Sequence, residues 1–442
     1  MVNVLNFVLL SGGPGKGLWP LTNDIRSKQF IKLLKKENGE YESMVQRMHR
    51  KLTELDKNAS ITVVTSKAQA SVVLNQLGDS VNISIEPERS HTFPAIVLAT
   101  AYLTDVRGIS KEEPIIVCPI DPYVDDDYYE TLMKMYDEAV KDDVNLVLMG
   151  IEPSYASEKY GYIIPYDDST VSRVKIFKEK PTKEAALSYI KDGALWNGGV
   201  FAFKPDYLLR KAHEIIDFKD YYDLYKQYES LPKISFDIAV AEKEMHTVVT
   251  RFKGQWKDLG NWSTITEAMG ENIVGNGILG NDCDDVHIVN EMEVPIIAMG
   301  LSDVVIAASP SGILVSDKEQ SSYILPFVDK LTKDVRFAEK SWGSYQVLDV
   351  EKDSLTIKVT LNEGHSMNYH SHKERDEVWT VISGCGETVV DGMHQRIKAG
   401  DVITMSAGCR HTVKAETELK LIEIQLGTEI SADDKQKFEL EY

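Results

Sequence analysis

The sequence has few cysteines, no excess of positive charge and no long apolar run near its N-terminus. Its four cysteines are widely spaced and form no CxxC pair, which argues against a disulfide framework or a zinc ribbon. The apolar stretch at residues 4–10 lacks a basic leader, is too short to span a bilayer and is unlike a signal peptide. We therefore predict a protein of the reducing cytoplasm with no membrane partner.

The charge balance is strongly acidic. With 49 basic and 69 acidic residues the formal net charge is −20, which would repel nucleic acid and anionic membrane surfaces. We therefore expect no nucleic-acid partner. A small phosphorylated substrate would need local cations or a metal ion to offset the negative field.

Length and patterning predict more than one domain. The chain has 442 residues, more than one hydrophobic core usually organises. Up to about residue 265, short β-rich runs alternate with stretches of helical period, which predicts an α/β fold with a doubly wound, Rossmann-like and largely parallel sheet. Ligands of such sheets bind beyond the carboxyl ends of the strands, so the loops after Leu10 and Cys118 are the first candidates for a site. The predicted segments are 6–10, 42–55, 60–65, 68–77, 115–118, 127–141 and 146–150.

The pattern changes twice in the C-terminal part. From about residue 272 to 330, short Val/Ile segments alternate with Gly, Asn and Asp, which indicates a few turns of a β-solenoid. After Trp342, alternating runs predict a small all-β barrel or jelly roll. We therefore predict three domains, at residues 1–268, 269–330 and 331–442.

A glycine-rich turn follows the first predicted strand. Glycines at 12, 13, 15 and 17 let successive backbone N–H groups converge on a polyphosphate, and Lys16 adds a mobile cation. The turn is not a Walker loop, because no Gly-Lys-Ser/Thr follows. An ordinary tight turn is the alternative interpretation.

The residues around this turn resemble a family signature. Gly12-Gly13-x-Gly15-x-x-Leu18-Trp19-Pro20-Leu21, followed by Lys28-Gln29-Phe30, resembles the signature of sugar-nucleotide pyrophosphorylases and, in detail, that of mannose-1-phosphate guanylyltransferases. Further segments occur in the order found in that family, which chance does not plausibly produce. They are Glu86-Pro87 with Thr92-x-Pro94-Ala95, Pro119-x-Asp121, Tyr160-Gly161-Tyr162-Ile163, Phe177-x-Glu179-Lys180-Pro181, Trp196-Asn197-x-Gly199-x-Phe201, Ser235-x-Asp237 and Trp256-x-Asp258-x-Gly260-x-Trp262.

This resemblance implies a reaction and a metal ion. A sugar 1-phosphate oxygen attacks the α-phosphorus of an NTP and pyrophosphate leaves, so charge neutralisation and alignment matter more than a strong base. GTP and mannose 1-phosphate are the implied substrates, GDP-mannose is the implied product, and Mg²⁺ is the implied cofactor. By this similarity, Asp121 and Asp258 hold the Mg²⁺ between both phosphates.

The resemblance also implies roles for the other site residues. Lys28 would contact the nucleotide phosphates, and Lys180 the sugar phosphate. Glu179 and Asn197 would accept hydrogen bonds from sugar hydroxyls, while Gly161 lets the backbone approach the sugar ring. The predicted nucleotide-binding set is Leu10, Gly12, Gly13, Gly15, Lys28 and Glu86, and the predicted catalytic set is Lys16, Lys28, Asp121 and Asp258.

One departure from the family pattern leaves alternatives open. This chain has Gly17 where the family usually carries an Arg thought to brace the phosphates, and losing such a cation typically costs several kcal/mol unless Lys16 or Arg26 supplies the charge. A pyrophosphorylase of other base or sugar specificity is therefore one alternative. A catalytically impaired regulatory protein that binds nucleotide sugars is the other.

The C-terminal part carries a second cluster of ligand-type residues. His370-x-His372, four residues and Glu377 match the first cupin motif, and a looser second motif reaches His411. Alternate residues of one strand face a barrel interior, so both imidazoles of the first motif would point to a centre that Glu377 and His411 also reach. Three imidazoles and one carboxylate suit Zn²⁺ or another divalent transition metal such as Fe, Mn or Ni.

Flanking segments such as Trp342-Gly343-Ser344-Tyr345 resemble the type II phosphomannose isomerase domain fused to guanylyltransferases. That resemblance implies a mannose-6-phosphate isomerase activity. The interval from His372 to Glu377 is longer than in that family, and no arginine follows Asp434, so we expect an isomerase that is weak, altered or absent. We predict a homodimer, and a purely structural cupin domain is the alternative to a metal-binding one.

Overall fold

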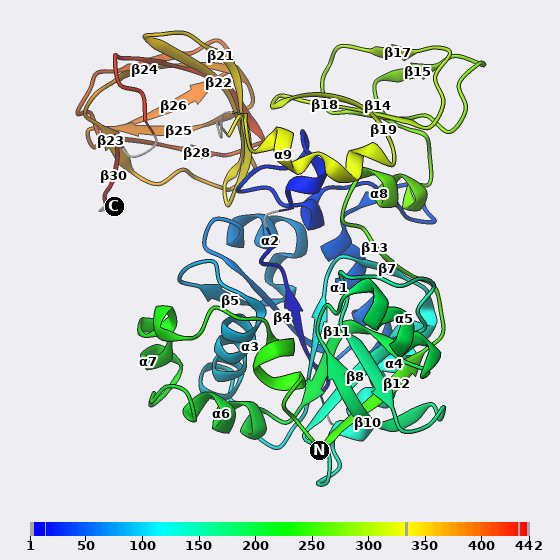
Figure 1. Ribbon diagram of the computed structural model, residues 1–442. Helices are drawn as coiled ribbons and strands as arrows, with labels where there is room; N and C mark the ends of the chain where they lie inside the picture. The colour runs from blue at the N-terminus through cyan, green and yellow to red at the C-terminus, as the bar shows by residue number, and fades with distance from the viewer. Residues whose placement is uncertain (1–3, 14, 332–334, 432–433, 440–442) are drawn as a thin grey trace. The chain divides into compact units, whose positions relative to one another are not determined.

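The computed structural model describes residues 4–13, 15–331, 335–431 and 434–439 (Figure 1). Contacts divide the chain into two compact units, an N-terminal unit of Met1–Gly13 with Gln29–Gly270 and a C-terminal unit of Pro14–Lys28 with Glu271–Tyr442. The division into three domains stays a prediction. Within the described ranges, the helices are too short or too polar for any of them to cross a lipid bilayer.

The N-terminal unit is built on a nine-stranded sheet in the order β5-β4-β1-β6-β11-β8-β12-β10-β9. Most strands of the sheet have apolar runs, as in β6, where every residue except Pro119 is fully buried, because helices cover them. The strands are β1 (Asn6–Leu10), β4 (Ser60–Ser66), β5 (Asn82–Glu86), β6 (Ile115–Pro119), β8 (Leu146–Ile151), β9 (Tyr162–Pro165), β10 (Val171–Lys178), β11 (Leu195–Phe203) and β12 (Thr247–Phe252). Short ribbons are formed by β2 (Leu34–Lys35) with β3 (Tyr41–Glu42), and by β7 (Pro122–Val124) with β13 (Trp256–Asp258).

The predicted α/β class is confirmed, but the sheet is less parallel than expected. Strands β1, β4, β5 and β6 pair in parallel. In contrast, β11 runs antiparallel to β6, β8 and β9, and β10 runs antiparallel to β9 and β12. The reason is local for β9 and β10, because only residues 166–170 join them and so short a connection permits a hairpin but no crossover.

Helices pack against this sheet according to their patterning. Every residue of α3 (Thr92–Ala101) is buried except its first, and this helix contacts β1, β4 and β5. Helix α4 (Asp126–Ala139) buries one face against β6, β8, β11 and β12. The other helices of the unit are α1 (Met44–Leu55), α2 (Ala70–Leu77), α5 (Lys183–Lys191), α6 (Pro205–His213), α7 (Tyr221–Lys226) and α8 (Trp262–Ala268).

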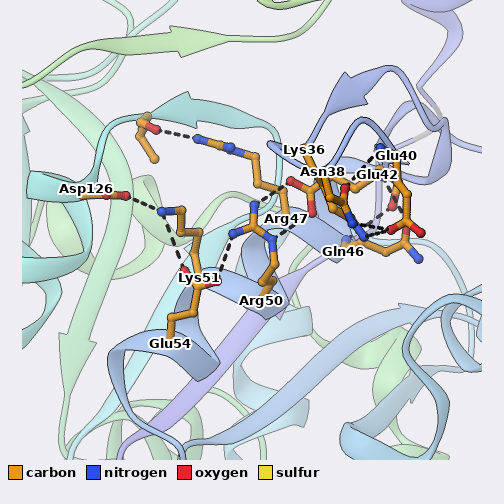
Figure 2. A network of polar contacts seen from close by, with 12 residues as sticks. Lys36, Asn38, Glu40, Glu42, Gln46, Arg47, Arg50, Lys51, Glu54 and Asp126 are labelled. Carbon is orange, nitrogen blue, oxygen red and sulfur yellow. Dashed lines mark hydrogen bonds and ion pairs between the residues drawn. The ribbon is translucent and has the colours of Figure 1, made fainter. Parts of the chain in front are cut away.

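A polar network surrounds α1 (Figure 2). The helix begins with a capping box, in which Ser43 Oγ accepts from Gln46 N–H and the Gln46 side chain accepts from Ser43 N–H. The Arg50 guanidinium then reaches Glu42 Oε1 at 2.7 Å and Glu54 Oε1 at 3.0 Å. Only 1% of the Glu42 side chain is exposed, compared with 54% of Glu54, so the two ion pairs have very different surroundings.

After Gly270, the C-terminal unit continues with short strands that stack on one another. Strands β14 (Ile273–Gly275), β16 (His287–Asn290) and β18 (Val304–Ser309) pair in parallel, as do β15 (Gly277–Leu279) and β17 (Ile296–Ala298), while β19 (Gly312–Asp317) closes the sheet antiparallel to β18. Parallel pairing of such short successive strands is the arrangement expected of a β-solenoid. Its small core contains Val286, Ile288, Ala298 and Ile306, and helix α9 (Leu325–Val328) follows.

The remainder of this unit is an all-β barrel of two sheets, ordered β20-β21-β22-β29-β24-β27 and β26-β25-β28-β23-β30. Trp379 is fully buried in the core between them. The strands are β20 (Phe337–Lys340), β21 (Gly343–Val350), β22 (Ser354–Leu361), β23 (His370–His372), β24 (Asp376–Ser383), β25 (Cys385–Val390), β26 (Met393–Lys398), β27 (Val402–Met405), β28 (His411–Ala415), β29 (Leu419–Leu426) and β30 (Lys435–Lys437).

The network around α1 yields a test of which ion pair stabilises the N-terminal unit. Arg50→Ala leaves the buried Glu42 carboxylate without its partner, so we expect the free energy of unfolding to fall by about 2–3 kcal/mol. Glu54→Ala removes only the exposed ion pair and should change the free energy of unfolding by less than about 0.5 kcal/mol. Urea denaturation of both variants measures the difference, and equal effects would contradict this ranking.

Candidate active site and metal centre

Two predicted metal ligands meet through backbone pairing. Asp121 follows β6 and directly precedes β7, and Asp258 ends β13. The two short strands pair antiparallel with Asp258 opposite Pro122, and Leu259 N–H donates to the Asp121 carbonyl at 3.2 Å. Residues more than a hundred positions apart in the chain are thus adjacent beyond the carboxyl end of β6, where a sheet of this kind binds its ligands.

Tyr160 faces both of these carboxylates. Burial raises the pKa of its phenol, and the negative charges of Asp258 and Asp121 raise it further. Its ring packs against Trp196 and Trp256, with centroids 5.0 and 5.5 Å away. A neutral phenol therefore lies next to the two acidic side chains.

Arg47 of α1 supports strand β7, which begins directly after Asp121. Arg47, labelled in Figure 2, donates from Nη2 to the Val124 carbonyl of β7 at 3.1 Å. Its guanidinium also lies 4.6 Å from the centre of the Tyr123 ring. A cation over an aromatic face and a charge-assisted hydrogen bond both stabilise this contact. Helix α1 thereby holds β7 in place next to Asp121.

Gly12 of the glycine-rich turn lies beside Glu86, and both residues belong to the predicted nucleotide-binding set. Strand β1 ends at Leu10, and a Cβ added at Gly12 would be 3.4 Å from Glu86 Oε2. The Glu86 side chain is 3% exposed, and its Oε1 accepts a hydrogen bond from the Tyr228 hydroxyl at 2.5 Å. Burial raises the pKa of this carboxyl, although the Tyr228 hydrogen bond opposes the shift. Among the described residues other than its chain neighbours, no atom lies within 4 Å of a Cβ placed at Gly13, so this side of Gly13 is open.

Lys16 and Lys28 lie in the segment 14–28, which packs in the C-terminal unit. There Lys16 Nζ donates to Asp329 Oδ1 at 2.7 Å. Gly15 has φ +62°, and a Cβ at this position would collide with the backbone nitrogen of Lys28, so only glycine fits. Hydrogen bonds from Ser309 Oγ to the Pro20 carbonyl (2.6 Å) and from Asn23 Nδ2 to the Phe337 carbonyl (2.9 Å) also tie the segment to its unit.

The predicted sugar-binding residues are brought together in the N-terminal unit. A Cβ at Gly161 would lie 2.6 Å from Glu179 Oε2 and 3.3 Å from the Cβ of Asn197, so these three residues are in direct contact. Asn197 N–H also donates to the Gly161 carbonyl at 2.8 Å. Lys180 Nζ lies 3.1 Å from Glu179 Oε1, and Lys180 adopts φ +43°, which is uncommon for a residue with a side chain. Such strain is frequent at binding sites.

The four predicted cupin ligands form one buried cluster. The ligand atoms of His370, His372, Glu377 and His411 lie within 4.8 Å of one another. His370 Nδ1 lies 2.6 Å from the Asn368 carbonyl and His411 Nδ1 lies 3.1 Å from the Cys409 carbonyl, so each ring donates there and presents the lone pair of Nε2. His411 Nε2 is 3.2 Å from Glu377 Oε2, and neither buried atom has a well-formed hydrogen bond among the described residues. This donor set fits a divalent metal ion.

The protonation states of this cluster also suit a metal. Burial lowers the pKa of His370 to about 2 and that of His372 to about 4, which keeps both imidazoles neutral. Burial raises the pKa of Glu377, but nearby positive charge outweighs this effect and lowers the pKa of the carboxyl. The Arg375 guanidinium contributes to that charge, with Nε 3.0 Å from Glu377 Oε1. Neutral imidazole and ionised carboxylate are the ligand forms that metals require.

A family model for nucleotidyl transferases matches residues 6–273, and the chain belongs to this family. Residues 329–440 match a second model, for the C-terminal region of mannose-6-phosphate isomerase. The resemblance predicted from the sequence is therefore confirmed for both parts of the chain. The two matches coincide with the α/β sheet and with the all-β barrel.

The relatives cover nearly the whole chain. The mannose-1-phosphate guanylyltransferase RfbM of Salmonella typhimurium is 29% identical over 97% of this chain and 95% of its own length. The xanthan biosynthesis protein XanB of Xanthomonas campestris is 27% identical over 98% of both chains. The crystal structure of a protein named mannose-1-phosphate geranyltransferase, from Thermus thermophilus, is 27% identical and matches 74% of this chain and 99% of its own with a TM-score of 0.61.

The sequence interpretation gave no role to several residues of these clusters. Tyr160 and Asp237 lie in segments that match the family pattern, but site roles were predicted only for other residues of the matching segments. Arg375 lies in the longer interval between His372 and Glu377, which was the signal that this stretch differs from the family. Glu423 was also missed, and burial together with the charge of Glu377 raises the pKa of its carboxyl.

The cupin cluster predicts about one divalent transition metal per chain. We expect His370→Ala and His411→Ala each to lower bound metal at least about tenfold, because each removes one of few ligands from a buried site. His394→Ala is the matched control, since His394 lies on the exposed strand β26 beside Glu387. Elemental analysis of the proteins after reconstitution with Zn²⁺, Mn²⁺, Fe²⁺ or Ni²⁺ measures this. Wild type that stays metal-free with all four ions would refute the site.

Proposed function

We propose that this protein transfers a guanylyl group from GTP to mannose 1-phosphate and releases pyrophosphate, forming GDP-mannose. The observation that carries the proposal is the pairing of β7 with β13, which places the two acidic residues Asp121 and Asp258 side by side in a nucleotidyl transferase fold. Two carboxylates beyond one strand end fit Mg²⁺, which would neutralise charge between the two phosphates. Relatives named mannose-1-phosphate guanylyltransferase match along nearly the whole chain and support this choice of substrates.

The buried carboxylate of Glu86 favours guanine over the other bases. A carboxylate offers only acceptors, and the Watson–Crick edge of guanine presents two adjacent donors, N1–H and the 2-amino group. Adenine and cytosine present one donor beside an acceptor, and uracil presents one donor between two acceptors. A base other than guanine would therefore leave an acceptor facing the Glu86 carboxylate, which costs binding free energy.

The roles of the two lysines and the activity of the cupin domain stay predictions. Lys16 and Lys28 are expected to contact nucleotide phosphates, and Lys16 or Arg26 would replace the cation lost at Gly17. We expect the isomerase activity of a metal-loaded cupin domain to be weak, altered or absent, because residues 435–442 contain no arginine to hold a distal phosphate. The homodimer is a prediction that light scattering of the purified protein measures. Localisation in the reducing cytoplasm also stays a prediction, and the four free cysteines are compatible with it.

Turnover with a panel of four NTPs and several sugar 1-phosphates tests the proposed reaction, with pyrophosphate as the readout. We expect GTP with mannose 1-phosphate to be preferred, and Asp258→Asn to lower kcat at least about a hundredfold because charge neutralisation is lost. Asp137→Asn, on the exposed side of α4, is the matched control and should be neutral. Preference for CTP or UTP would contradict the GDP-mannose assignment, and nucleotide binding without turnover would favour the regulatory alternative.

Base selection has its own test. Glu86→Gln keeps the volume of the side chain but replaces one acceptor with a donor, so we expect kcat/KM for GTP to fall about tenfold or more and discrimination against ATP to narrow. Glu88→Gln, two residues along the chain and paired with Lys233, is the matched control. An unchanged ratio of GTP to ATP turnover in Glu86→Gln would show that Glu86 does not read the base.

A further inference from the structure

Asp237 is a half-buried carboxylate that has no assigned role. It begins the π-helical turn Asp237–Ala241, a form of helix that is rare and frequent at functional sites. The turn lies after Phe236, which is fully buried, so the position of the carboxylate is fixed by the core. Asp237 is forty positions along the chain from Asn197, whose side-chain amide donates a hydrogen bond to it.

The contact with Asn197 is short and directional. Asn197 Nδ2 donates to Asp237 Oδ1 at 2.6 Å, and Gly199 N–H donates to Asn197 Oδ1 at 3.2 Å. The two contacts together determine which end of the amide is oxygen and which is nitrogen, so the side chain cannot turn over without losing both. An amide has two N–H donors and two acceptor lone pairs, and one of each is left for a ligand.

The surroundings of this pair suit a ligand rich in hydroxyl groups. Burial raises the pKa of the Glu179 carboxyl, and the negative charge of the nearby Asp237 raises it further. The ammonium group of Lys180 lies 3.1 Å from the Glu179 carboxylate. Glu179 and Asn197 pack directly against Gly161, where only glycine fits, and Lys180 and Asp237 adjoin this pair through their own contacts with Glu179 and Asn197. Hydroxyl groups donate to carboxylates and both accept from and donate to amides, whereas an apolar ligand would leave these groups unpaired.

We propose that Asp237 is a positioning residue of the sugar site. Its carboxylate holds the Asn197 amide in the one orientation that pairs with the ring hydroxyls of a hexose 1-phosphate. The inference rests on the proposed function, because it takes the Gly161, Glu179 and Asn197 cluster as the sugar site. Asp237 acts through Asn197 and not on the phosphates. Its loss therefore affects the sugar substrate and leaves the nucleotide unaffected.

The test compares Asp237→Ala with the conservative Asp237→Asn. Alanine frees the Asn197 amide, so we expect KM for mannose 1-phosphate to rise about tenfold or more while KM for GTP changes less than about twofold. Asparagine keeps an acceptor for Asn197 Nδ2, so it should restore the KM for mannose 1-phosphate to within about threefold of wild type. Glu242→Gln, which follows the same turn and pairs with Lys178 at 2.6 Å, is the matched control and should be unchanged.

A double-mutant cycle separates positioning from general damage. If Asp237 acts through Asn197, Asn197→Ala with Asp237→Ala should be no worse than Asn197→Ala alone, because coupled residues are non-additive. Additive losses, or an equal rise in the KM for GTP, would overturn the inference. Thermal unfolding of each variant checks its folding, and the stabilisation of each variant by mannose 1-phosphate alone gives a binding readout without turnover.

The outcomes for the inference and for the proposed function differ. If wild type releases pyrophosphate and Asp237→Ala matches it in both KM values, the inference fails and the proposed function stands. If wild type turns over no pair of substrates, the proposed function fails. In that case, loss of stabilisation by mannose 1-phosphate in Asp237→Ala but not in Asp237→Asn would still support the positioning role, and equal stabilisation in all variants would overturn it.

Discussion

The antiparallel pairing of β7 with β13 is the constraint on which the proposed nucleotidyl transfer site depends. Strand β13 follows β12 in the chain and is far from β7 in sequence. The two strands pair because the fold of the sheet places the segment after β12 near the end of β6. The pairing places the backbones of Asp121 and Asp258 next to each other beyond the end of β6, where two acidic residues can serve one cation. The Arg47 contact to Val124 shows that α1 helps to hold the ribbon.

The polar clusters of both units follow one physical rule. In three of the proposed ligand side chains a backbone group fixes one end, so that the other end is presented in a defined direction. The Gly199 N–H does this for Asn197, and the carbonyls of Asn368 and Cys409 do it for His370 and His411. Groups held in this way lose little conformational entropy when a ligand binds, which favours tight and specific recognition.

Elements with strong local signals were predictable from the sequence, and contacts between distant residues were not. The spacing of β1, α1, β4 and β6 follows from apolar runs and helical periods, and His370 with His372 follows from alternation along one strand. The antiparallel course of β11 has no local signal, because it depends on tertiary pairing. The contact of Asp237 with Asn197 and that of Lys16 with Asp329 are likewise set by the fold, so motif matching could name the segments without giving these partners.

The most direct measurement of the central claim is the binding of Mn²⁺, as a spectroscopic substitute for Mg²⁺, by electron paramagnetic resonance in the presence of a non-hydrolysable GTP analogue. The account predicts a nucleotide-dependent site of about one ion per chain that is lost in Asp121→Asn and in Asp258→Asn alike, since both carboxylates serve the same ion. Binding that survives in either variant would contradict it.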